Sequence, residues 1–474
     1  MRDCLLSNKK LEISILNLSD VYKLDVTKRI DSEYFQNKYL EMDSGRFSDR
    51  LCYYNDIIVK GGKRLPPGHD FTNGQGTPYI RAQDIRNSFV ISINSPLIEK
   101  STFEKLANYK IEDKDVLVTI VGNSIGEIGF AKTMPKNSVL TENAVAIRSE
   151  TLPPEVIFVY LMGKYGSNYI QRNTVGTAQP KLSIERIRQF KYPNITKELS
   201  ERIVSLVEEA FKIHSERVEL YSMLENKILD YFDYLSLKTE KNGTTPVLRQ
   251  LKEIKAFNRM DAEYFQLFYE SIEKNINAVH HGKKLIESGI ELIASSFKPE
   301  RKKVYKYIEL SNIGSYGEIT GFTEAFGANL PSRAKRILKK DDILVSSIEG
   351  SLQSCAIVTE EFDGAVCSTG FYVLRAENMS PYFLLALLKS EMMQLLLKKR
   401  CSGTILTSIN KEEFMTLPIP TVGPEFEEII SKMFKDTLEL RVKCNEILEY
   451  CKHTVEIAIE EGEEKALMFI DRCL

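Results

Sequence analysis

Two similar pairs of carboxylates are the first residues whose spacing could support chemistry. The pattern D-x-E-Y-F occurs at Asp31 with Glu33 and again at Asp261 with Glu263. Two nearby carboxyl groups could serve as a general acid and a general base. Each pair stands two residues after an arginine, however, and such neighbours form local ion pairs or helix caps without any special geometry. We therefore interpret both pairs as structural.

Motifs of transferases and nucleotide-binding enzymes are incomplete. An amino-methyltransferase loop needs Asp, Asn or Ser before Pro-Pro and an aromatic residue after it, whereas the chain has only Leu152-Pro153-Pro154-Glu155 and Leu65-Pro66-Pro67-Gly68. A P-loop needs G-x-x-x-x-G-K followed by Ser or Thr. Gly61-Gly62-Lys63-Arg64 lacks both the spacing and the hydroxyl group. The sequence thus predicts no catalytic residues, no cofactor and a chain that is not itself an enzyme.

The eight cysteines are scattered and contain no C-x-x-C pair, which predicts reduced thiols and no disulfide framework. Cys444 and Cys451 are seven residues apart with His453 nearby, a spacing that fits packing better than a zinc site. His214 is likewise interpreted as a packed histidine. We expect no metal site.

Charge is distributed unevenly along the chain, although the formal net charge is only −2. Residues 298–340 hold ten Lys and Arg against four Glu, and residues 198–232 hold four Lys and Arg against eight acids. One surface could therefore face phosphate and another a partner or solvent. No apolar leader and no stretch near the ~20 apolar residues of a membrane span is visible, so a soluble, cytoplasmic protein is expected.

The strongest signal is an internal repeat. RIDSEYFQNKY from Arg29 recurs as RMDAEYFQLFY from Arg259, 230 residues later. Further matches follow in the same order: YIRAQDI with YIELSNI, KDVLVTIVG with DDILVSSIE, TENAVAIR with STGFYVLR, and ERIVS with EEIIS. Gly176-Thr177 and Leu182-Ser183-Ile184 match Gly403-Thr404 and Thr407-Ser408-Ile409, with the second copy two residues shorter. One long period predicts two whole domains related by a pseudo-dyad.

Each copy predicts the same elements in the same order. An aromatic and charged segment, predicted as helix, precedes short apolar strands such as VLVTIV and ILVSSI, separated by Gly- and Pro-rich loops. A buried helical stretch follows, at residues 153–171 and 380–399.

A long segment without Gly or Pro then begins in each copy. Apolar residues recur there at three- and four-residue steps, which is typical of a helical seam. The seam positions are Ile203, Val207, Ala210, His214, Val218, Tyr221, Leu224 and Ile228 in the first copy and Met433, Thr437, Leu440, Cys444, Ile447, Cys451 and Thr454 in the second. A helix of ~33 residues spans roughly 50 Å, so an antiparallel pair could act as a ruler; the alternative is that each helix packs only on its own domain.

These features resemble the specificity subunit of type I restriction-modification systems. The resemblance rests on motifs of the YIR..DI, GD.LV and G..Q..LS type, found here at Tyr79–Ile85, Lys114–Val118 and Gly176–Ser183, and on the duplication with its two helices. It implies an α+β fold with two pseudo-symmetric mixed α/β target-recognition domains, each followed by a long helix, the helices forming an antiparallel coiled-coil-like spacer. The implied segments are domain 1 at 1–195, spacer helix 1 at 196–240, domain 2 at 241–420 and spacer helix 2 at 421–474.

The resemblance also implies partners. Each domain would read one half of a split target on double-stranded DNA, and the helices would dock two adenine-N6 methyltransferase subunits; a motor-nuclease subunit is a further possible partner. The second copy departs from the motifs, because Glu309 replaces the arginine and the loop lacks Gln and Pro-Lys. The two half-sites would thus differ. The alternative is a two-domain protein-interaction scaffold that never touches DNA.

DNA contacts are expected from loops that offer Lys or Arg to phosphate and Arg, Gln, Ser or Thr to base edges. The candidates in the first copy are Lys60, Lys63, Arg64, Arg81, Arg86, Thr177, Gln179 and Lys181. Those in the second copy are Arg301, Lys302, Lys303, Lys306, Arg333, Lys335, Arg336, Thr404 and Thr407.

Overall fold

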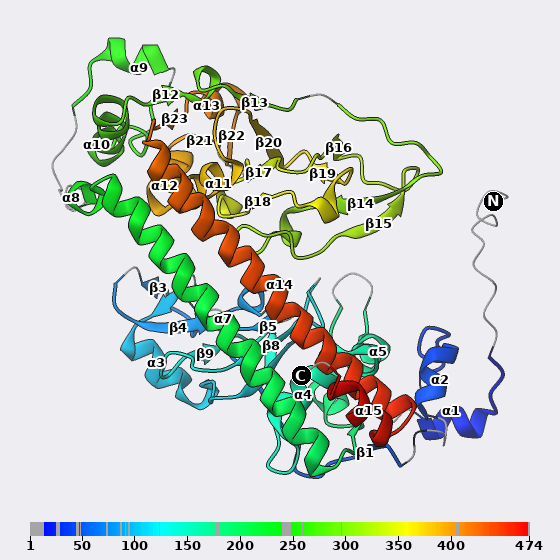
Figure 1. Ribbon diagram of the computed structural model, residues 1–474. Coiled ribbons are helices and arrows are strands. Elements are labelled where there is room, and N and C mark those ends of the chain that lie inside the picture. The colour runs from blue at the N-terminus through cyan, green and yellow to red at the C-terminus, as the bar shows by residue number, and fades with distance from the viewer. Residues whose placement is uncertain are drawn as a thin grey trace. The chain divides into compact units, whose positions relative to one another are not determined.

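The computed structural model has mixed α/β architecture with several small sheets and two long helices (Figure 1). It describes residues 14–24, 29–43, 47, 49–72, 74–85, 88–90, 92, 95–122, 124–176, 180–238, 248–257, 259–294, 296–403 and 407–472. The chain divides into two compact units: unit 1 comprises 1–214 with 442–474, and unit 2 comprises 215–441. Each unit is described by itself below.

Unit 1 contains two main sheets. The first has the strand order β2-β10-β7-β8-β5 and the second the order β3-β6-β4-β9. The strands are β1 (Leu51–Cys52), β2 (Ile58–Gly61), β3 (Phe71–Thr72), β4 (Thr77–Ile80), β5 (Ser88–Phe89), β6 (Leu97–Ile98), β7 (Asp115–Thr119), β8 (Ile128–Ala131), β9 (Val139–Leu140), β10 (Ala144–Arg148) and β11 (Tyr192–Pro193). All residues of β7 and β8 are buried, as their uninterrupted apolar runs predict.

Helices cover the first sheet of unit 1. The helices before the long one are α1 (Leu18–Leu24), α2 (Asn37–Asp43), η3 (Ala82–Asp84), α3 (Lys100–Leu106), η4 (Ala107–Tyr109), α4 (Pro154–Met162), α5 (Lys164–Asn173) and α6 (Ile184–Ile187). Helix α4 starts with proline at its first position, which needs no hydrogen-bond donor, and its residues from Glu155 to Leu161 are all buried. Phe158 of this helix stacks on Phe130 of β8 at 5.2 Å.

Unit 2 repeats this arrangement. Its two four-stranded sheets have the orders β13-β20-β17-β18 and β15-β14-β19-β16. The strands are β12 (Lys283–Lys284), β13 (Ile290–Leu292), β14 (Val304–Ile308), β15 (Thr323–Phe326), β16 (Ala334–Ile337), β17 (Ile343–Ser346), β18 (Cys355–Ile357), β19 (Val366–Ser368), β20 (Phe371–Ala376), β21 (Cys401–Ser402), β22 (Ser408–Ile409) and β23 (Pro418–Ile419). The shorter helices are α8 (Tyr234–Lys238), α9 (Leu251–Phe257), α10 (Leu267–Lys274), η6 (Asn275–Val279), η7 (Leu285–Glu287), η8 (Leu310–Asn312), η9 (Glu349–Ser351), η10 (Glu360–Phe362), α11 (Pro381–Lys389), α12 (Glu391–Lys399) and α13 (Lys411–Met415).

The strand registers of the two units agree residue by residue. In unit 1 the antiparallel strands β7 and β10 place Leu117 opposite Ala146. In unit 2, β17 and β20 place Leu344 opposite Val373, each residue standing 227 positions later. This agreement supports the duplication inferred from the sequence.

The second sheets agree as well. Strands β4 and β9 are parallel, with Tyr79 beside Val139, and strands β14 and β19 are parallel, with Tyr307 beside Val366. The offsets are 228 and 227 residues. The Y-I motif therefore occupies the same strand position in both units.

The predicted shortening of the second copy after Gly403 is wrong. Leu182 donates its N–H to Ile120 O at 2.9 Å, and Ile409 donates to Ser347 O at 2.8 Å, both partners standing 227 residues later. Ser183 caps α6 and Asn410 caps α13 at the same offset. Backbone pairing thus keeps both loops the same length, whereas the sequence match of L-S-I with T-S-I shifted the alignment by two residues.

Two further expectations need correction. Each buried stretch predicted as one helix consists of two: Gly163 has an extended conformation between α4 and α5, and Ser390 likewise separates α11 from α12. Ser390 also accepts a hydrogen bond from Met393 N–H, which caps α12. In addition, the repeated aromatic segments begin as turns before α2 and α10.

The two long segments without Gly or Pro form the helices α7 (Lys197–Tyr231) and α14 (Pro424–Glu460), and α15 (Glu463–Ile470) follows. Most of the predicted seam is buried. Ile203, Val207, Ala210, Ile228, Thr437, Cys451 and Thr454 are completely buried. No helix within the described residues is both long and apolar enough to cross a membrane.

Within unit 1, the first part of α7 packs antiparallel to the second part of α14. The Cys444 thiol lies 3.4 Å from Ala210 O, and Thr196 N–H donates to the Glu463 carboxylate beyond the other end of the contact. His214 packs on the ring of Phe89 with 5.1 Å between ring centroids, so the interpretation of His214 as a packed histidine is confirmed.

Within unit 2, the remaining parts of the two helices also run antiparallel. Tyr231 stacks on Phe426 at 3.8 Å, and Tyr221 lies 6.3 Å from Phe434. Residue numbers in these contacts rise along α7 while they fall along α14, so the two helix parts are antiparallel, as are those of unit 1.

A buried ion cluster joins these helix parts to the rest of unit 2. Arg217 Nη2 lies 3.0 Å from Glu318 Oε2, and Arg441 Nε lies 3.8 Å from Glu318 Oε1. Burial alone would raise the pKa of Glu318, but the two guanidinium groups outweigh it and hold the pKa at about 2. Glu318 is therefore ionised inside the protein.

Candidate nucleic-acid interface

The candidates Lys60, Lys63 and Arg64 lie at the end of β2, where the chain passes close to β9. Lys63 N–H donates to Leu140 O at 2.9 Å, and Gly62 lies so close that an added Cβ would stand 2.0 Å from Thr141 O. Only glycine permits this approach of two backbones. The side chains of Lys63 and Arg64 are exposed, while Lys60 is half-buried.

Arg64 is exposed but already has a partner. Its Nε lies 2.7 Å from Glu142 Oε1, and Glu142 also accepts the Tyr79 hydroxyl at 3.3 Å. Burial by itself would raise the pKa of Glu142, but the hydrogen bonds from Arg64, Thr141 and the backbone, together with the charge of Arg64, lower it. Tyr79 donates to Lys63 O at 2.7 Å as well, and thereby fixes this loop. The sequence analysis did not predict that Glu142 and Tyr79 hold Arg64 and the backbone of Lys63 in place. The signal available for Glu142 was a single acidic residue before the apolar run AVAIR.

Arg81 follows β4 and is half-buried. Its backbone N–H and its Nε both reach Asp84 Oδ2, at 2.8 and 3.3 Å, so it caps the short helix η3. In unit 2, Glu309 and Asn312 form the same cap, with 2.9 Å between Glu309 N and Asn312 Oδ1. The cap is thus common to both units, whereas the charge at its first residue is reversed. Arg86 lies outside the described residues.

The loop with Thr177, Gln179 and Lys181 is closed by a short hairpin. Val175 and Lys181 exchange two backbone hydrogen bonds, at 2.9 and 2.8 Å, and the Lys181 side chain is exposed. Thr177 and Gln179 lie outside the described residues.

The equivalent loop of unit 2 is closed by strands β21 and β22, with Ser402 opposite Ser408. Thr404 lies outside the described residues, and Thr407 is half-buried. Ser408 stands where unit 1 has Lys181, so the closing pairs of the two hairpins carry different side chains.

Arg301, Lys302 and Lys303 form an exposed turn immediately before β14. Gly327 N–H donates to Lys303 O at 2.9 Å, and the Lys303 ammonium lies 5.3 Å from the centre of the Tyr305 ring. Lys306 differs, because its ammonium group donates to Glu361 O at 3.0 Å and is partly covered. The turn is therefore the more accessible source of positive charge.

Arg333, Lys335 and Arg336 lie on or beside β16. Phe297 N–H donates to Lys335 O at 2.6 Å, and the Phe297 ring packs on Tyr305 at 5.5 Å. The structure thus brings the segment before the basic turn against β16. Arg333 and Lys335 are exposed, whereas Arg336 is half-buried, and its Nη1 is a buried atom without a hydrogen-bond partner among the described residues.

Exposed apolar side chains lie beside the basic turn and were not selected from the sequence. Val304 and Phe326 face each other across β14 and β15 and are 48% and 51% exposed. In unit 1, Phe71 of β3 is 49% exposed and lies 5.7 Å from Tyr79. Apolar and aromatic groups of this kind could contact bases or sugars.

The repeated D-x-E carboxylates have structural partners. Asp31 binds the Arg29 guanidinium through both oxygens, at 2.6 and 2.7 Å, and Asp261 binds Arg259 at 2.9 and 2.6 Å. The hydrogen bond from the arginine lowers the pKa of each aspartate. Both carboxyl groups are therefore held ionised and accept hydrogen bonds, which suits a structural role.

Among known protein families, one family model matches part of the chain. Residues 54–208 match the family model described as the type I restriction modification DNA specificity domain. No curated protein matches the chain.

Solved structures similar to the chain include the S subunit of a type I restriction-modification system from M. genitalium, at 13% identity and a TM-score of 0.28, covering 87% of this chain and 94% of that one. The HsdS subunit from Thermoanaerobacter tengcongensis is similar at 11% identity and a TM-score of 0.26, covering 86% and 98%.

Proposed function

We propose that this chain, in which residues 54–208 are a type I restriction modification DNA specificity domain, reads a bipartite target on double-stranded DNA. The observation that carries the proposal is a contrast between the two units. Their strand registers and hairpins agree, but Arg81 is replaced by Glu309 and Lys181 by Ser408. Two units with the same strand arrangement but different loop side chains are suited to bind two half-sites of different sequence.

Charge distribution supports the same assignment. The exposed turn Arg301–Lys303 and the exposed residues Arg333 and Lys335 supply local positive charge in a chain of net charge −2. Lysines and arginines that neutralise phosphates release condensed counterions, which makes binding depend strongly on salt. We assign these residues to phosphate contacts.

In unit 1 we assign the phosphate contacts to Lys60, Lys63 and Lys181. Arg64 and Arg81 hold orientations fixed by Glu142 and Asp84. Fixed side chains suit base edges, because a planar guanidinium group makes paired hydrogen bonds there. We assign base contacts to Arg64, Arg81 and the hairpin loops.

We propose that α7 and α14 form an antiparallel coiled-coil-like spacer. At 1.5 Å per residue, their 35 and 37 residues correspond to roughly 50 to 55 Å. One turn of DNA is about 34 Å, so a rod of this length fits two half-sites separated by more than one turn. The division into domains 1–195 and 241–420 with spacer helices 196–240 and 421–474 is part of this proposal.

Chemistry would then reside in partners. We propose that the chain is non-catalytic and docks two adenine-N6 methyltransferase subunits, to which a motor-nuclease subunit can be added. The duplication supports two equivalent docking positions. The structural use of Asp31 and Asp261 supports the absence of a carboxylate active site in the repeated turn.

A gel-shift experiment tests the function. The chain, purified with its methyltransferase partner, is titrated against DNA that carries the methylated motif and against scrambled DNA, at several salt concentrations. We expect preference for the motif and a steep loss of affinity as salt rises. Equal and salt-independent retention of both DNAs would instead support a protein-interaction scaffold.

A further inference from the structure

The arginine of the repeated turn, Arg29 or Arg259, binds an aspartate, a backbone carbonyl and a tyrosine ring in both units. We call this set of contacts the clip. In unit 1, Arg29 binds Asp31 through two hydrogen bonds and donates Nη1 to Arg172 O at 3.0 Å. Its guanidinium carbon lies 4.8 Å from the centre of the Tyr34 ring. The Arg29 side chain is only 15% exposed, whereas its partner Asp31 is 43% exposed, so the arginine is covered while the carboxylate stays open to water.

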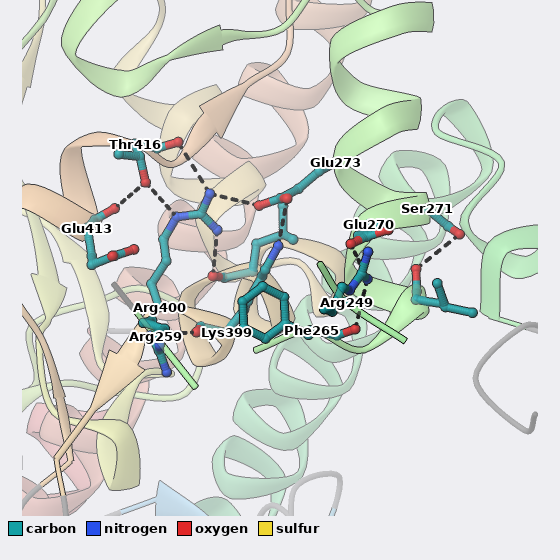
Figure 2. A network of polar contacts seen from close by, with 12 residues as sticks. Arg249, Arg259, Phe265, Glu270, Ser271, Glu273, Lys399, Arg400, Glu413 and Thr416 are labelled. Carbon is teal, nitrogen blue, oxygen red and sulfur yellow. Dashed lines mark hydrogen bonds and ion pairs between the residues drawn. The ribbon is translucent and has the colours of Figure 1, made fainter. Parts of the chain in front are cut away.

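Unit 2 reproduces each contact. Arg259 binds Asp261, and its guanidinium carbon lies 4.4 Å from the centre of the Tyr264 ring. Its Nη1 donates to Lys399 O at 3.2 Å (Figure 2). Its Nη2 also donates to Cys401 O at 2.8 Å, and Cys401 is the first residue of β21. The clip therefore reaches the hairpin itself.

The carbonyls that the clip holds stand directly before the candidate DNA loops. Arg172 is in the last turn of α5, three residues before the hairpin residue Val175, and Lys399 ends α12, two residues before Cys401. The last carbonyls of a helix have no partner inside the helix, so a side-chain donor there fixes where the next segment starts.

We propose that Arg29 and Arg259 are positioning residues that set the paired hairpin residues Val175 and Lys181, and Ser402 and Ser408, toward one DNA half-site each. The inference rests on the proposed function. A planar guanidinium group can bind a carboxylate with two donors and still offer others to carbonyl oxygens. Lysine keeps the charge but offers one nitrogen, so it cannot hold the turn and the hairpin together.

The first test needs no DNA. Hydrogen exchange of the purified complex is compared between wild type, Arg259→Lys and Arg249→Lys. Arg249 is the matched control, because it donates to Phe265 O at 3.0 Å and pairs with Glu270, both outside the hairpin. We expect Arg259→Lys to speed exchange at the hairpin amides of Ser402 and Ser408 about tenfold, and Arg249→Lys to leave them unchanged. Unchanged hairpin exchange in Arg259→Lys overturns the inference.

The second test separates the two half-sites. Binding is measured on the motif and on DNAs altered in one half only, for wild type, Arg29→Lys and Arg259→Lys. We expect each variant to lose about tenfold discrimination at one half-site, different for the two variants, which is the scale of one base contact. Arg50→Lys is the control in unit 1, since Arg50 donates to Ile459 O at 3.0 Å.

The outcomes are distinguishable. Absence of any discrimination in wild type would refute the proposed function, whereas intact discrimination in both arginine variants overturns only the clip. Where Arg259→Lys lowers the folded fraction, Asp261→Asn loosens the same guanidinium without removing the buried cation. We expect Asp261→Asn to give the same half-site loss, and full discrimination in it overturns the clip as well.

Discussion

In unit 1, Arg172 Nη2 lies 2.6 Å from Asp43 Oδ2. At the equivalent positions of unit 2, Lys399 Nζ lies 2.7 Å from Glu273 Oε2, so a different cation and a different anion form the same ion pair. Both members changed and the ion pair remained. The charges of this structural ion pair are thus the same in both units. By contrast, Lys181 and Ser408, at equivalent positions of the two hairpins, differ in charge.

Loss of Glu273 should destabilise unit 2. Its two oxygens accept hydrogen bonds from Lys399 at 2.7 Å and Arg400 at 2.9 Å, and both cations are only 6% exposed (Figure 2). Glu273→Gln removes the charge that compensates two buried cations, and we expect a loss of about 3 to 5 kcal/mol in urea unfolding. Glu263→Gln is the control, because the Glu263–Lys398 pair is about half exposed and should contribute ~1 kcal/mol or less. Equal effects of both variants would contradict the role of burial.

Acid should weaken unit 2 through Glu318. Its pKa in the folded protein is about 2, below the ordinary value near 4.3, so its ionised form stabilises the fold above the ordinary value. That stabilisation, on the order of 3 kcal/mol, is lost as pH falls from about 4.5 through 2. Glu318→Gln should be less stable at pH 7, and its deficit against wild type should shrink across this window. A deficit that is constant with pH would show that Glu318 does not titrate there.

Gly62 should tolerate no side chain. A Cβ would stand 2.0 Å from Thr141 O and 2.4 Å from Leu140 O, both backbone atoms. We expect Gly62→Ala to lower the free energy of unfolding by about 1 to 3 kcal/mol and to weaken DNA binding through Lys63 and Arg64. Gly74→Ala, whose nearest neighbour would be 3.6 Å away, should stay within ~0.5 kcal/mol of wild type. Thermal melts of both variants decide the matter.

The basic turn should contribute to affinity without sequence preference. Replacing Arg301, Lys302 and Lys303 by Ala should weaken binding to all DNAs by a similar factor and reduce the slope of log K against log salt by about one per cation. The pair Lys283→Ala/Lys284→Ala, on the exposed strand β12, controls for loss of charge alone. An unchanged slope in the triple variant would exclude the turn from the phosphate contacts.

The hairpin loops should be exchangeable. Because both loops have the same number of residues, Gln179→Leu with Lys181→Ser gives these two DNA-binding candidates of the first loop the residues at the equivalent positions of the second. We expect a folded protein with unchanged melting temperature and reduced discrimination at the first half-site. Retained discrimination there would assign the reading of that half-site to other loops.

Some of this arrangement was predictable from local pattern. The seam of α7 follows from apolar residues at three- and four-residue steps, and Ile203, Val207 and Ala210 are all fully buried. The repeat predicted two similar domains, because several motifs that recur in the same order at a nearly constant offset indicate a duplicated segment.

Long-range partners could not be predicted. Arg64 pairs with Glu142, 78 residues away, and Lys306 donates to Glu361 O, 55 residues away. Both looked free in the sequence, because neither partner lies near them along the chain. The sequence alignment of the two hairpin loops was wrong for a related reason. Their equivalent residues are defined by backbone hydrogen bonds to distant strands, and a match of short sequence motifs does not report such bonds.

The clip shows the same limit. Arg29 next to Asp31 predicted a local salt bridge, and that contact is present. The second half of the clip, the donation to Arg172 O, joins residues 143 positions apart and is visible only in the fold.

Unit 1 is built from two separate segments of the chain, and this affects the order in which the units fold during synthesis. Its core contains Cys444, Leu448 and Val455 as well as Ile203 and Val207. Residues 215–441 therefore leave the ribosome as a contiguous folding unit before the residues 442–474 that complete unit 1. We expect the second-encoded half to mature first, while the first-encoded half waits with an open apolar groove along α7, a state in which chaperones would engage the nascent chain.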